Sequence, residues 1–436
     1  MQTCDLLIKD SSVLISAETL REHTDIVINA GRIEEAGAGL WKKYRASETI
    51  NGKGKLFMPG LIDSHVHTGQ QLLKGFVLDA KPIIWTRIML PFESTLTSEK
   101  MRLSAQAAAL EMIKSGTTGF IDAGSYFMED AAAVYAESGL RGALSYSTMD
   151  EEGLPESISM SAKEAVKRTD SLYDRFHGKG SLKVYYSLRA LNSCSSRLVE
   201  LESEHARERG TMLQAHMNEY MGEINGIMAR EGMRPYEYLE KMQVLDSNFL
   251  GAHSLILSDE EKALIKERGV KVCHCPFSNC GKAVPDTPQL LDMGISIGMG
   301  TDGAAHGGLS LWNEMKIFRS LMNIYHGVPG SNPKIMPAET IFRMVLEGGA
   351  AALYEEDSLG RLESGYKADI ISINMDQPHL CPTGNKLHTL LECVNAGDVA
   401  DMIVGGRLIM KDREVLSMDE EKILYESGKY MESVNK

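Results

Sequence analysis

The sequence predicts a mixed α/β fold, a (β/α)₈ barrel (TIM barrel) joined to a small β-sandwich domain built from both chain ends. Two observations predict it. In the middle of the chain, helical stretches alternate with short apolar runs, which is typical of parallel strands wrapped by helices. At both ends, short apolar segments are separated by turn residues instead, which is typical of strands in a small sheet.

The alternation of helices and strands runs through most of the central segment. The predicted helices, each with the apolar run that follows it, are 98–115 with 119–122, 129–138 with 142–146, 196–209 with 212–216, and 258–268 with 270–275. The central segment is longer than the roughly 250 residues of a typical barrel, so we expect insertions. No G-x-G-x-x-G fingerprint of a dinucleotide-binding sheet stands at a strand-to-helix turn.

The two chain ends are predicted to pair into one β domain. Apolar runs at 5–15 and 25–29 resemble those at 368–373 and 401–410 in length and in their flanking turn residues. We therefore expect three parts. Residues 1–57 and 366–436 form the two halves of the β-sandwich, and residues 58–365 form the barrel.

Composition limits the classes of partner. The chain has 436 residues and a formal net charge of −14, so no basic surplus is available to neutralise nucleic acid or an anionic membrane. No apolar stretch reaches membrane-spanning length. Seven cysteines, an odd number, argue against a disulfide framework, and the N-terminus lacks the features of a signal peptide. We expect a cytoplasmic protein that binds neither nucleic acid nor an anionic membrane.

Polar side chains stand where several apolar runs end. His65 and His67 close the first run, and they point to the same side because alternate residues of a strand share a face. His216, His253 and Asp302 close later runs. Because barrel active sites gather at the carboxyl ends of the strands, we expect these side chains to converge. Imidazole and carboxylate groups are suitable ligands for zinc or iron.

Simpler interpretations exist for several of these residues. An isolated H-x-H pair is weak evidence, and His253 could be a core or capping histidine. Glu219 could be an acid at a helix N-terminus, where the helix dipole favours it. The run 273–275 (Cys-His-Cys), with Cys280, could suggest a structural zinc site. It has no second paired motif at a suitable spacing, so we predict buried strand residues there.

These motifs together resemble the amidohydrolase superfamily over nearly the whole chain. The resemblance is carried by the histidines above, by 301–303 (Thr-Asp-Gly), by 59–63 (Pro-Gly-Leu-Ile-Asp) and by 365–369 (Gly-Tyr-Lys-Ala-Asp). Within it, Glu219 three residues after His216 and the run 275–279 (Cys-Pro-Phe-Ser-Asn) are most similar to deaminases and chlorohydrolases of nitrogen heterocycles.

The resemblance implies a hydrolase of carbon–nitrogen bonds other than peptide bonds, a cyclic amidine deaminase that releases ammonia. It also implies one divalent metal ion per subunit, zinc or alternatively iron(II). The implied ligands are His65, His67, His216 and Asp302. Relatives with two metal ions carry a lysine at the end of the fourth strand, and the run 184–188 ends without one.

The resemblance also implies catalytic roles. Asp302 would take a proton from the attacking water, and His253 would orient the resulting hydroxide. Glu219 would protonate the ring nitrogen and then the leaving ammonia. Proton transfer of this kind is typically worth about 10²–10⁴ in rate.

Three further residues bear on the substrate. Gln70 and Arg189 resemble residues that recognise the carbonyl and nitrogens of the ring in guanine deaminases. Adenosine-type relatives usually carry histidine at the position of Arg189. Trp85 could stack on a flat ring or pack in the core. A guanine-, pterin- or oxopurine-like ring is therefore favoured. The run 301–305 (Thr-Asp-Gly-Ala-Ala) is closer to adenosine-type relatives, the methylthioadenosine/S-adenosylhomocysteine deaminases. His306 could line the pocket or only shape its loop.

Other functions stay open at this point. Adenosine-type deamination is one alternative, and triazine-type chlorohydrolysis or aminohydrolysis is another. Cyclic-amide hydrolysis is disfavoured because the bridging lysine is missing. A non-enzymatic scaffold is disfavoured because such proteins lose ligands and this chain retains the implied set. Both a homodimer and a monomer are compatible with the sequence.

Overall fold

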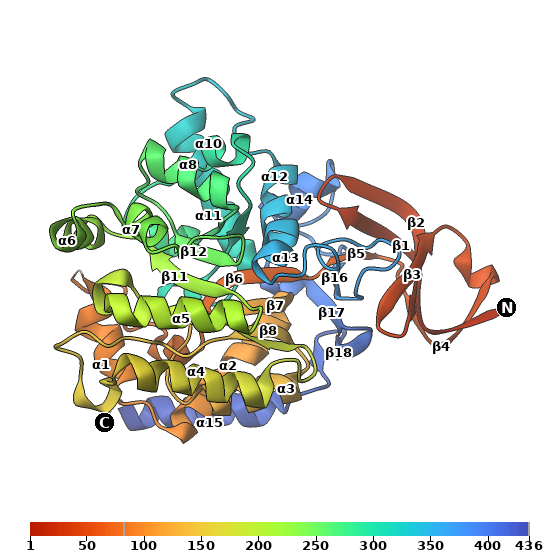
Figure 1. The fold of residues 1–436 in the computed structure, drawn as a ribbon. Helices are drawn as coiled ribbons and strands as arrows, with labels where there is room; N and C mark the ends of the chain where they lie inside the picture. The colour runs from red at the N-terminus through yellow and green to blue at the C-terminus, as the bar shows by residue number, and fades with distance from the viewer. Residues whose placement is uncertain (82, 435–436) are drawn as a thin grey trace.

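The computed structural model describes residues 1–81 and 83–434. A parallel barrel surrounded by helices forms one part of the molecule, and a sheet built from both chain ends lies beside it (Figure 1). This architecture confirms the predicted fold class. The N-terminal strands within residues 2–51, red in Figure 1, project from the side of the molecule.

The barrel has eight strand positions within the described part of the chain, and the fourth and eighth are each split in two. In order they are β6 (Leu61–His67), β7 (Thr117–Asp122), β8 (Arg141–Leu144), β9 (Leu182–Val184) with β10 (Tyr186–Leu188), β11 (Leu213–Met217), β12 (Phe249–His253), β13 (Lys271–His274), and β14 (Ile297–Met299) with β15 (Asp302–Gly303). The pairing of β15 with β6 closes the ring and sets Gly303 opposite His67.

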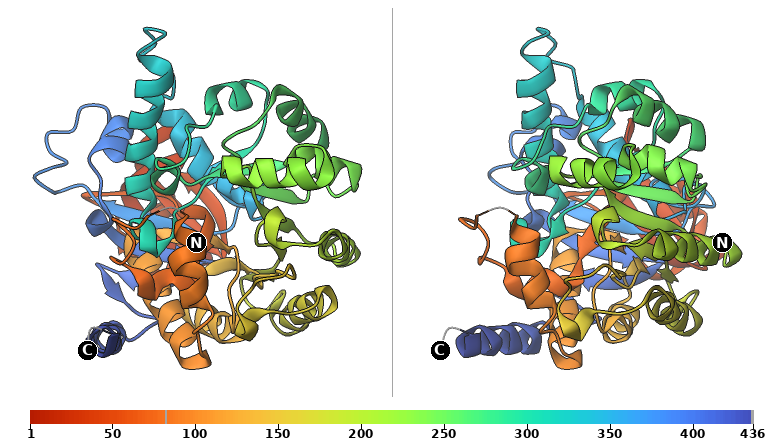
Figure 2. Two further views of the ribbon diagram at one scale, coloured as in Figure 1. Left: turned by 90° about the vertical axis from the view of Figure 1, so that its left-hand side faces the viewer. Right: turned by 60° about the vertical axis from the view of Figure 1, so that its left-hand side comes forward.

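Helices that connect these strands or follow the last of them cover the outside of the barrel (Figure 2). They are α1 (Leu90–Glu93), α2 (Ser98–Ser115), α3 (Met128–Ser138), α4 (Ala162–Phe176), α5 (Ser196–Glu208), α6 (Met221–Glu231), α7 (Pro235–Lys241), α8 (Asp259–Arg268), α9 (Pro276–Asn279), α10 (Thr287–Asp292), α11 (Leu311–Met322), α12 (Ala338–Arg343) and α13 (Gly349–Ala352). Local signals fix their ends. Helix α8 begins with a capping box between Ser258 and Glu261 and ends at Gly269, whose φ is +66°.

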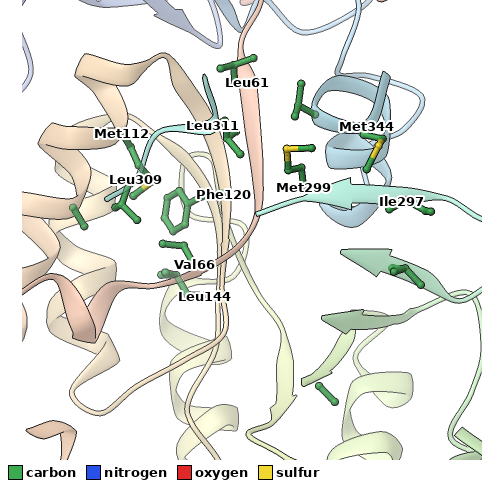
Figure 3. Close-up of a cluster of buried hydrophobic side chains, with 14 of the residues drawn as sticks. Leu61, Val66, Met112, Phe120, Leu144, Ile297, Met299, Leu309, Leu311 and Met344 are labelled. Atoms are coloured by element: carbon green, nitrogen blue, oxygen red, sulfur yellow. The ribbon is translucent and has the colours of Figure 1, made fainter. Parts of the chain in front are cut away.

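Apolar side chains from the strands and helices fill the core (Figure 3). Val66, Phe120 and Leu144 come from three neighbouring strands and are completely buried. Met112 of α2 and Met299 of β14 belong to the same cluster. Burying one such side chain typically stabilises a fold by about 1.5–3 kcal/mol. This packing fixes the strands whose carboxyl ends carry the polar residues.

The two chain ends form one nine-stranded sheet in the described residues. Its strands are β1 (Gln2–Ser16), β2 (Thr19–Asn29), β3 (Arg32–Gly37), β4 (Tyr44–Asn51), β5 (Lys55–Pro59), β16 (Ile370–Asn374), β17 (Val399–Val404), β18 (Arg407–Lys411) and β19 (Glu414–Val415). The antiparallel pair β5–β16 joins the two ends. Ile8, Ile28 and Phe57 pack with Ile370 and Ile403 in a cluster that both ends share, as the sequence predicted.

The C-terminal part also contains two helices that the sequence analysis did not predict. They are α14 (Lys386–Glu392) and α15 (Glu420–Val434). Helix α15 lies against α2, and Lys114 contacts Glu420 at 3.0 Å. The domain boundaries at residues 57 and 365 remain a prediction. Among the described residues, no helix combines the length and the apolar character needed to cross a bilayer.

Candidate active site

Five polar side chains meet at the carboxyl ends of the barrel strands. Nε2 of His67 lies 3.1 Å from Nε2 of His216 and 3.3 Å from Oδ1 of Asp302. Nε2 of His65 lies 3.8 Å from the same oxygen. The ring of His253 lies beside the rings of His65 and His216, with centroids 5.2 and 5.3 Å away. The structure therefore brings together all five residues expected to converge.

The geometry and protonation of this cluster fit a divalent cation. One ligand atom each from His65, His67 and Asp302 lie within 4.8 Å of one another, and the same holds for His65, His216 and His253. Both ring nitrogens of His65 are buried without a hydrogen-bond partner. Burial lowers the pKa of His65 and of His216 well below the usual value. Their rings are therefore neutral at pH 7 and can donate lone pairs to a metal.

The carboxylate of Asp302 is ionised and held in place. Burial alone would raise its pKa, but a hydrogen bond from His67 and the charge of Lys282 hold that pKa well below the usual range. The hydroxyl of Ser278 donates to Oδ2 of Asp302 at 2.6 Å. Three imidazoles and an ionised carboxylate are the donor set of a catalytic zinc or iron(II) site.

Unusual backbone conformations at and near the cluster set the directions of its side chains. His253 and Asp302 have φ values of +68° and +60°, in the left-handed region that residues other than glycine rarely adopt. Asn218, directly after β11, has a φ of +48°. Its amide group donates to Glu261 at 2.9 and 3.0 Å. Such conformations cost free energy and cluster at functional sites.

Glu219 stands at the edge of the cluster and lines a cavity of about 470 Å³. Its Oε1 lies 3.6 Å from Nε2 of His253. Its backbone N–H donates to the carboxylate of Glu223 at 3.0 Å. Burial favours the neutral acid, but the charges of His253 and Lys282 oppose that effect and leave the pKa of Glu219 below its usual value.

A contact with Asn279 orients the ring of His253. Its Nδ1 lies 3.0 Å from the side-chain oxygen of Asn279, so its Nε2 faces the cluster without a hydrogen-bond partner. Nδ1 of His274 contacts the backbone oxygen of His253 at 2.8 Å and therefore supports the end of β12. Cys273 of β13 and Cys275, directly after that strand, are buried and free, as expected. The prediction is wrong for Cys280, which is exposed and follows α9, because the chain has left the strand and formed a short helix by that point.

Of the residues expected to contact the substrate, Gln70, Trp85 and Arg189 line the same cavity as Glu219, whereas His253 is not part of its wall. Nη1 of Arg189 lies 2.8 Å from Nδ1 of His67, and Nη2 lies 3.8 Å from Glu93. Gln70 donates to Glu93 at 2.9 Å. The guanidinium of Arg189 lies 5.6 Å from the ring centre of Trp85, within range of a cation–π interaction. His306 also lines the cavity, so of its two possible roles the structure favours the pocket.

The sequence analysis missed three charged residues of the site. Glu93 is completely buried beneath Gln70 and Arg189, Glu223 bonds the backbone of Glu219, and Lys282 contacts Glu219 and Asp302. None stands at the end of a barrel strand, so the strand-end criterion could not select them. A signal for Lys282 existed, because it stands four residues after Ser278 of the Cys-Pro-Phe-Ser-Asn motif.

Comparisons with known proteins identify the family of the chain. The sequence model of the amidohydrolase family matches residues 56–409. A 5'-deoxyadenosine deaminase of Methanosarcina mazei is 33% identical over 99% of this chain and 98% of its own. A 5-methylthioadenosine/S-adenosylhomocysteine deaminase of Thermococcus onnurineus is 34% identical, over 94% and 95% of the two chains.

A solved structure shares the fold. The adenosine deaminase from Xanthomonas campestris, crystallised with bound zinc, superposes with a TM-score of 0.93 at 23% identity, covering 100% of this chain and 99% of the other. The chain belongs to the amidohydrolase family. The expected hydrolase is thereby confirmed.

Proposed function

We propose that this protein hydrolytically deaminates an amino-substituted purine and releases ammonia. The observation that carries the proposal is the position of Glu219, whose carboxylate stands 3.6 Å from His253 beside the imidazole–carboxylate cluster and in the wall of the cavity. Hydrolysis of a cyclic amidine requires a proton-transferring acid next to a metal-binding set of residues, because the amino group leaves as ammonia only after it has gained a proton.

His65, His67, His216 and Asp302 would hold the divalent cation, zinc or alternatively iron(II). When bound, such an ion supplies acidity, because it lowers the pKa of a coordinated water from about 15.7 to about 7. The orphaned nitrogens of His65 and the ionised Asp302 support this ligand set.

The remaining steps belong to side chains of the cavity. Asp302 is ionised and can accept the proton of the attacking water. His253, fixed at Nδ1 by Asn279, presents Nε2 to orient that water. Attack at the amino-bearing carbon places negative charge on the neighbouring ring nitrogen, and the two protons of the attacking water supply both transfers. Glu219 takes up one and delivers it to this nitrogen, and the one taken by Asp302 then passes through Glu219 to the departing amino group, so both carboxylates end ionised as they began.

An adenosine-type nucleoside is the favoured substrate class. The two curated relatives described above are named as deaminases of such compounds, which supports this class over the guanine- or pterin-like ring expected from Gln70 and Arg189. The cavity of about 470 Å³ also falls within the roughly 300–1,000 Å³ of pockets that enclose whole drug-sized ligands, so it has room for more than a bare base.

A guanine-like ring is the second candidate, and one observation favours it. Arg189 points a guanidinium into the cavity beside His67, and a guanidinium offers several donors in a fixed plane that suit a ring carbonyl. Its contacts to Glu93 and to the ring of Trp85 hold that plane in position.

Ammonia release from a panel of amino heterocycles tests the proposal. The panel contains 5'-deoxyadenosine, 5'-methylthioadenosine, S-adenosylhomocysteine, guanine, pterin and a chlorotriazine, for which chloride is measured as well. We expect turnover of the adenosine-type compounds. Turnover of guanine or pterin alone would move the assignment to the second candidate, and chloride release without ammonia would contradict deamination.

A substitution tests the role of Glu219. Glu219→Gln is expected to lower kcat by about 10²–10⁴ while the protein retains its metal. Glu231→Gln, at the last residue of α6, is the matched control and is expected to leave kcat unchanged. A metal-loaded Glu219→Gln protein with wild-type kcat would refute the role.

A further inference from the structure

Lys282 is a buried cation in the wall of the cavity. Its side chain is only 7% exposed, and it lies in the loop between α9 and α10. Nζ donates a hydrogen bond to Oε1 of Glu219 and another, of 2.7 Å, to the hydroxyl of Ser278. The same nitrogen lies 3.8 Å from Oδ2 of Asp302.

Ser278 extends this contact to the second carboxylate. Its hydroxyl accepts from Lys282 and donates to Oδ2 of Asp302 at 2.6 Å. We call Lys282, Ser278, Glu219 and Asp302 the lysine bridge. Through it, one ammonium group connects the two carboxylates assigned to proton transfer, although Glu219 follows β11 and Asp302 begins β15.

The chemistry of lysine suits this connection. An ammonium has three donors on a flexible stem, and Glu219, Ser278 and Asp302 lie around it. Buried charges require partners, so the two carboxylates and the ammonium hold one another in place. Because these donors face protein oxygens, little of the ammonium is left for a substrate anion.

A lysine with a purely structural role would have its partners outside the active site. Lys262 is a comparable case, since its side chain is 10% exposed and it pairs with Asp286 at 2.8 Å. Its partners lie outside the cluster of histidines and acids, whereas both acidic partners of Lys282 line the cavity beside that cluster.

We propose that Lys282 is a positioning residue of the deaminase, which holds the Glu219 carboxylate next to His253 and, through Ser278, fixes the orientation of Asp302. This inference rests on the proposed function. It assigns to Lys282 no contact with the substrate and no proton transfer. Its effect is on the placement of Glu219, and displacement of a catalytic group by about 1 Å can lower a rate by roughly 100-fold.

Lys282→Met tests the proposal, because methionine preserves an unbranched apolar stem and removes the ammonium. We expect kcat to fall roughly 10- to 100-fold while KM changes by less than about threefold. Metal content, measured by atomic emission, is expected to equal that of the wild type. An unchanged kcat, a change confined to KM, or loss of metal would each overturn the positioning role.

Rescue separates positioning from general destabilisation. Lys282→Ala leaves room for a small amine, and ethylammonium is expected to restore part of kcat in a saturable manner. Lys262→Met is the matched control, and its kcat is expected to stay near wild type and not to respond to the amine. Absence of rescue in Lys282→Ala would count against the bridge.

The substrate panel and the Glu219→Gln variant distinguish the two proposals. If the wild-type protein releases no ammonia from any compound of the panel, the proposed function fails, whereas full turnover by Glu219→Gln refutes only the role of Glu219. If Glu219→Gln is inactive but Lys282→Met has the wild-type kcat, only the lysine bridge fails. Should Lys282→Met not be recovered folded, Ser278→Ala breaks the bridge with a smaller change, and kcat is expected to fall about 10-fold. An unchanged kcat in Ser278→Ala would then overturn the inference.

Discussion

The carboxylate of Asp63 accepts two hydrogen bonds from Thr301, one from its backbone N–H at 3.1 Å and one from its hydroxyl at 2.6 Å. It accepts a third from the backbone N–H of His65 at 3.2 Å. Asp63 belongs to β6, and Thr301 directly precedes Asp302 of β15. One buried acid therefore fastens the first barrel strand to the last, directly behind two of the proposed metal ligands.

Removal of the Thr301 hydroxyl is expected to loosen this connection. In Thr301→Val an oxygen of Asp63 loses its donor in a buried position, which typically costs about 1–3 kcal/mol. We expect the free energy of unfolding in urea to fall by that amount and zinc affinity to decrease. Thr117→Val is the matched control, because the buried Thr117 hydroxyl has no hydrogen-bond partner among the described residues. Equal losses in both variants would contradict the role of the Asp63 contact.

Metal retention is expected to resist mild acid. A proton competes with a metal for imidazole, so ordinary histidines lose metal as the pH falls through about 6.5. Burial lowers the pKa of His65 and of His216 well below 6.5, so both rings stay neutral there. Metal content after dialysis should therefore be the same at pH 7.5 and pH 6. Loss of half the metal near pH 6.5 would contradict the expectation, and His65→Ala should lack metal at both values.

Arg189 is expected to affect substrate binding more than metal binding. Arg189→Met removes the guanidinium from the cavity and should raise KM about 10-fold or more, with unchanged metal content. It also leaves the buried Glu93 with one fewer partner, so unfolding free energy should fall by roughly 1–3 kcal/mol. Adding Glu93→Gln should recover part of that stability. A variant with wild-type KM for the preferred substrate would remove Arg189 from the binding site.

Glu355 provides a test of acid stability away from the active site. Burial raises its pKa, but hydrogen bonds from Lys367 and Ser358 and the charge of Lys183 outweigh that effect and lower it from 4.5 to about 2. A depressed pKa stabilises the fold above pH 4.5, and this contribution disappears as the pH falls from 4.5 toward 2.

Glu355→Gln is therefore expected to be less stable than the wild type by roughly 1 kcal/mol at pH 7, after allowance for solvent screening. The difference should shrink toward zero near pH 2–3. Urea unfolding of both metal-free proteins at several pH values measures it. A difference that stays constant with pH would show that the ion pairs are not its source.

Much of the fold follows from signals that act within a few residues. The helix at 98–115 was predicted to the residue, and the predicted helix at 258–268 differs from α8 by one residue at its start, where Ser258 is the cap. Alternation along one strand places His65 and His67 on the same side. Helix α15 was not predicted, and its position against α2 depends on contacts with a distant segment.

The sequence by itself determined the parallel barrel and which histidines and aspartate stand at its strand ends, because strand alternation, caps and turn residues are local properties. Only the tertiary structure decided that Glu93 lies under Arg189, that Lys282 joins Glu219 to Ser278, and that Asp63 meets Thr301. Asp63 and Thr301 are 238 positions apart. They meet only because closure of the barrel places the last strand beside the first.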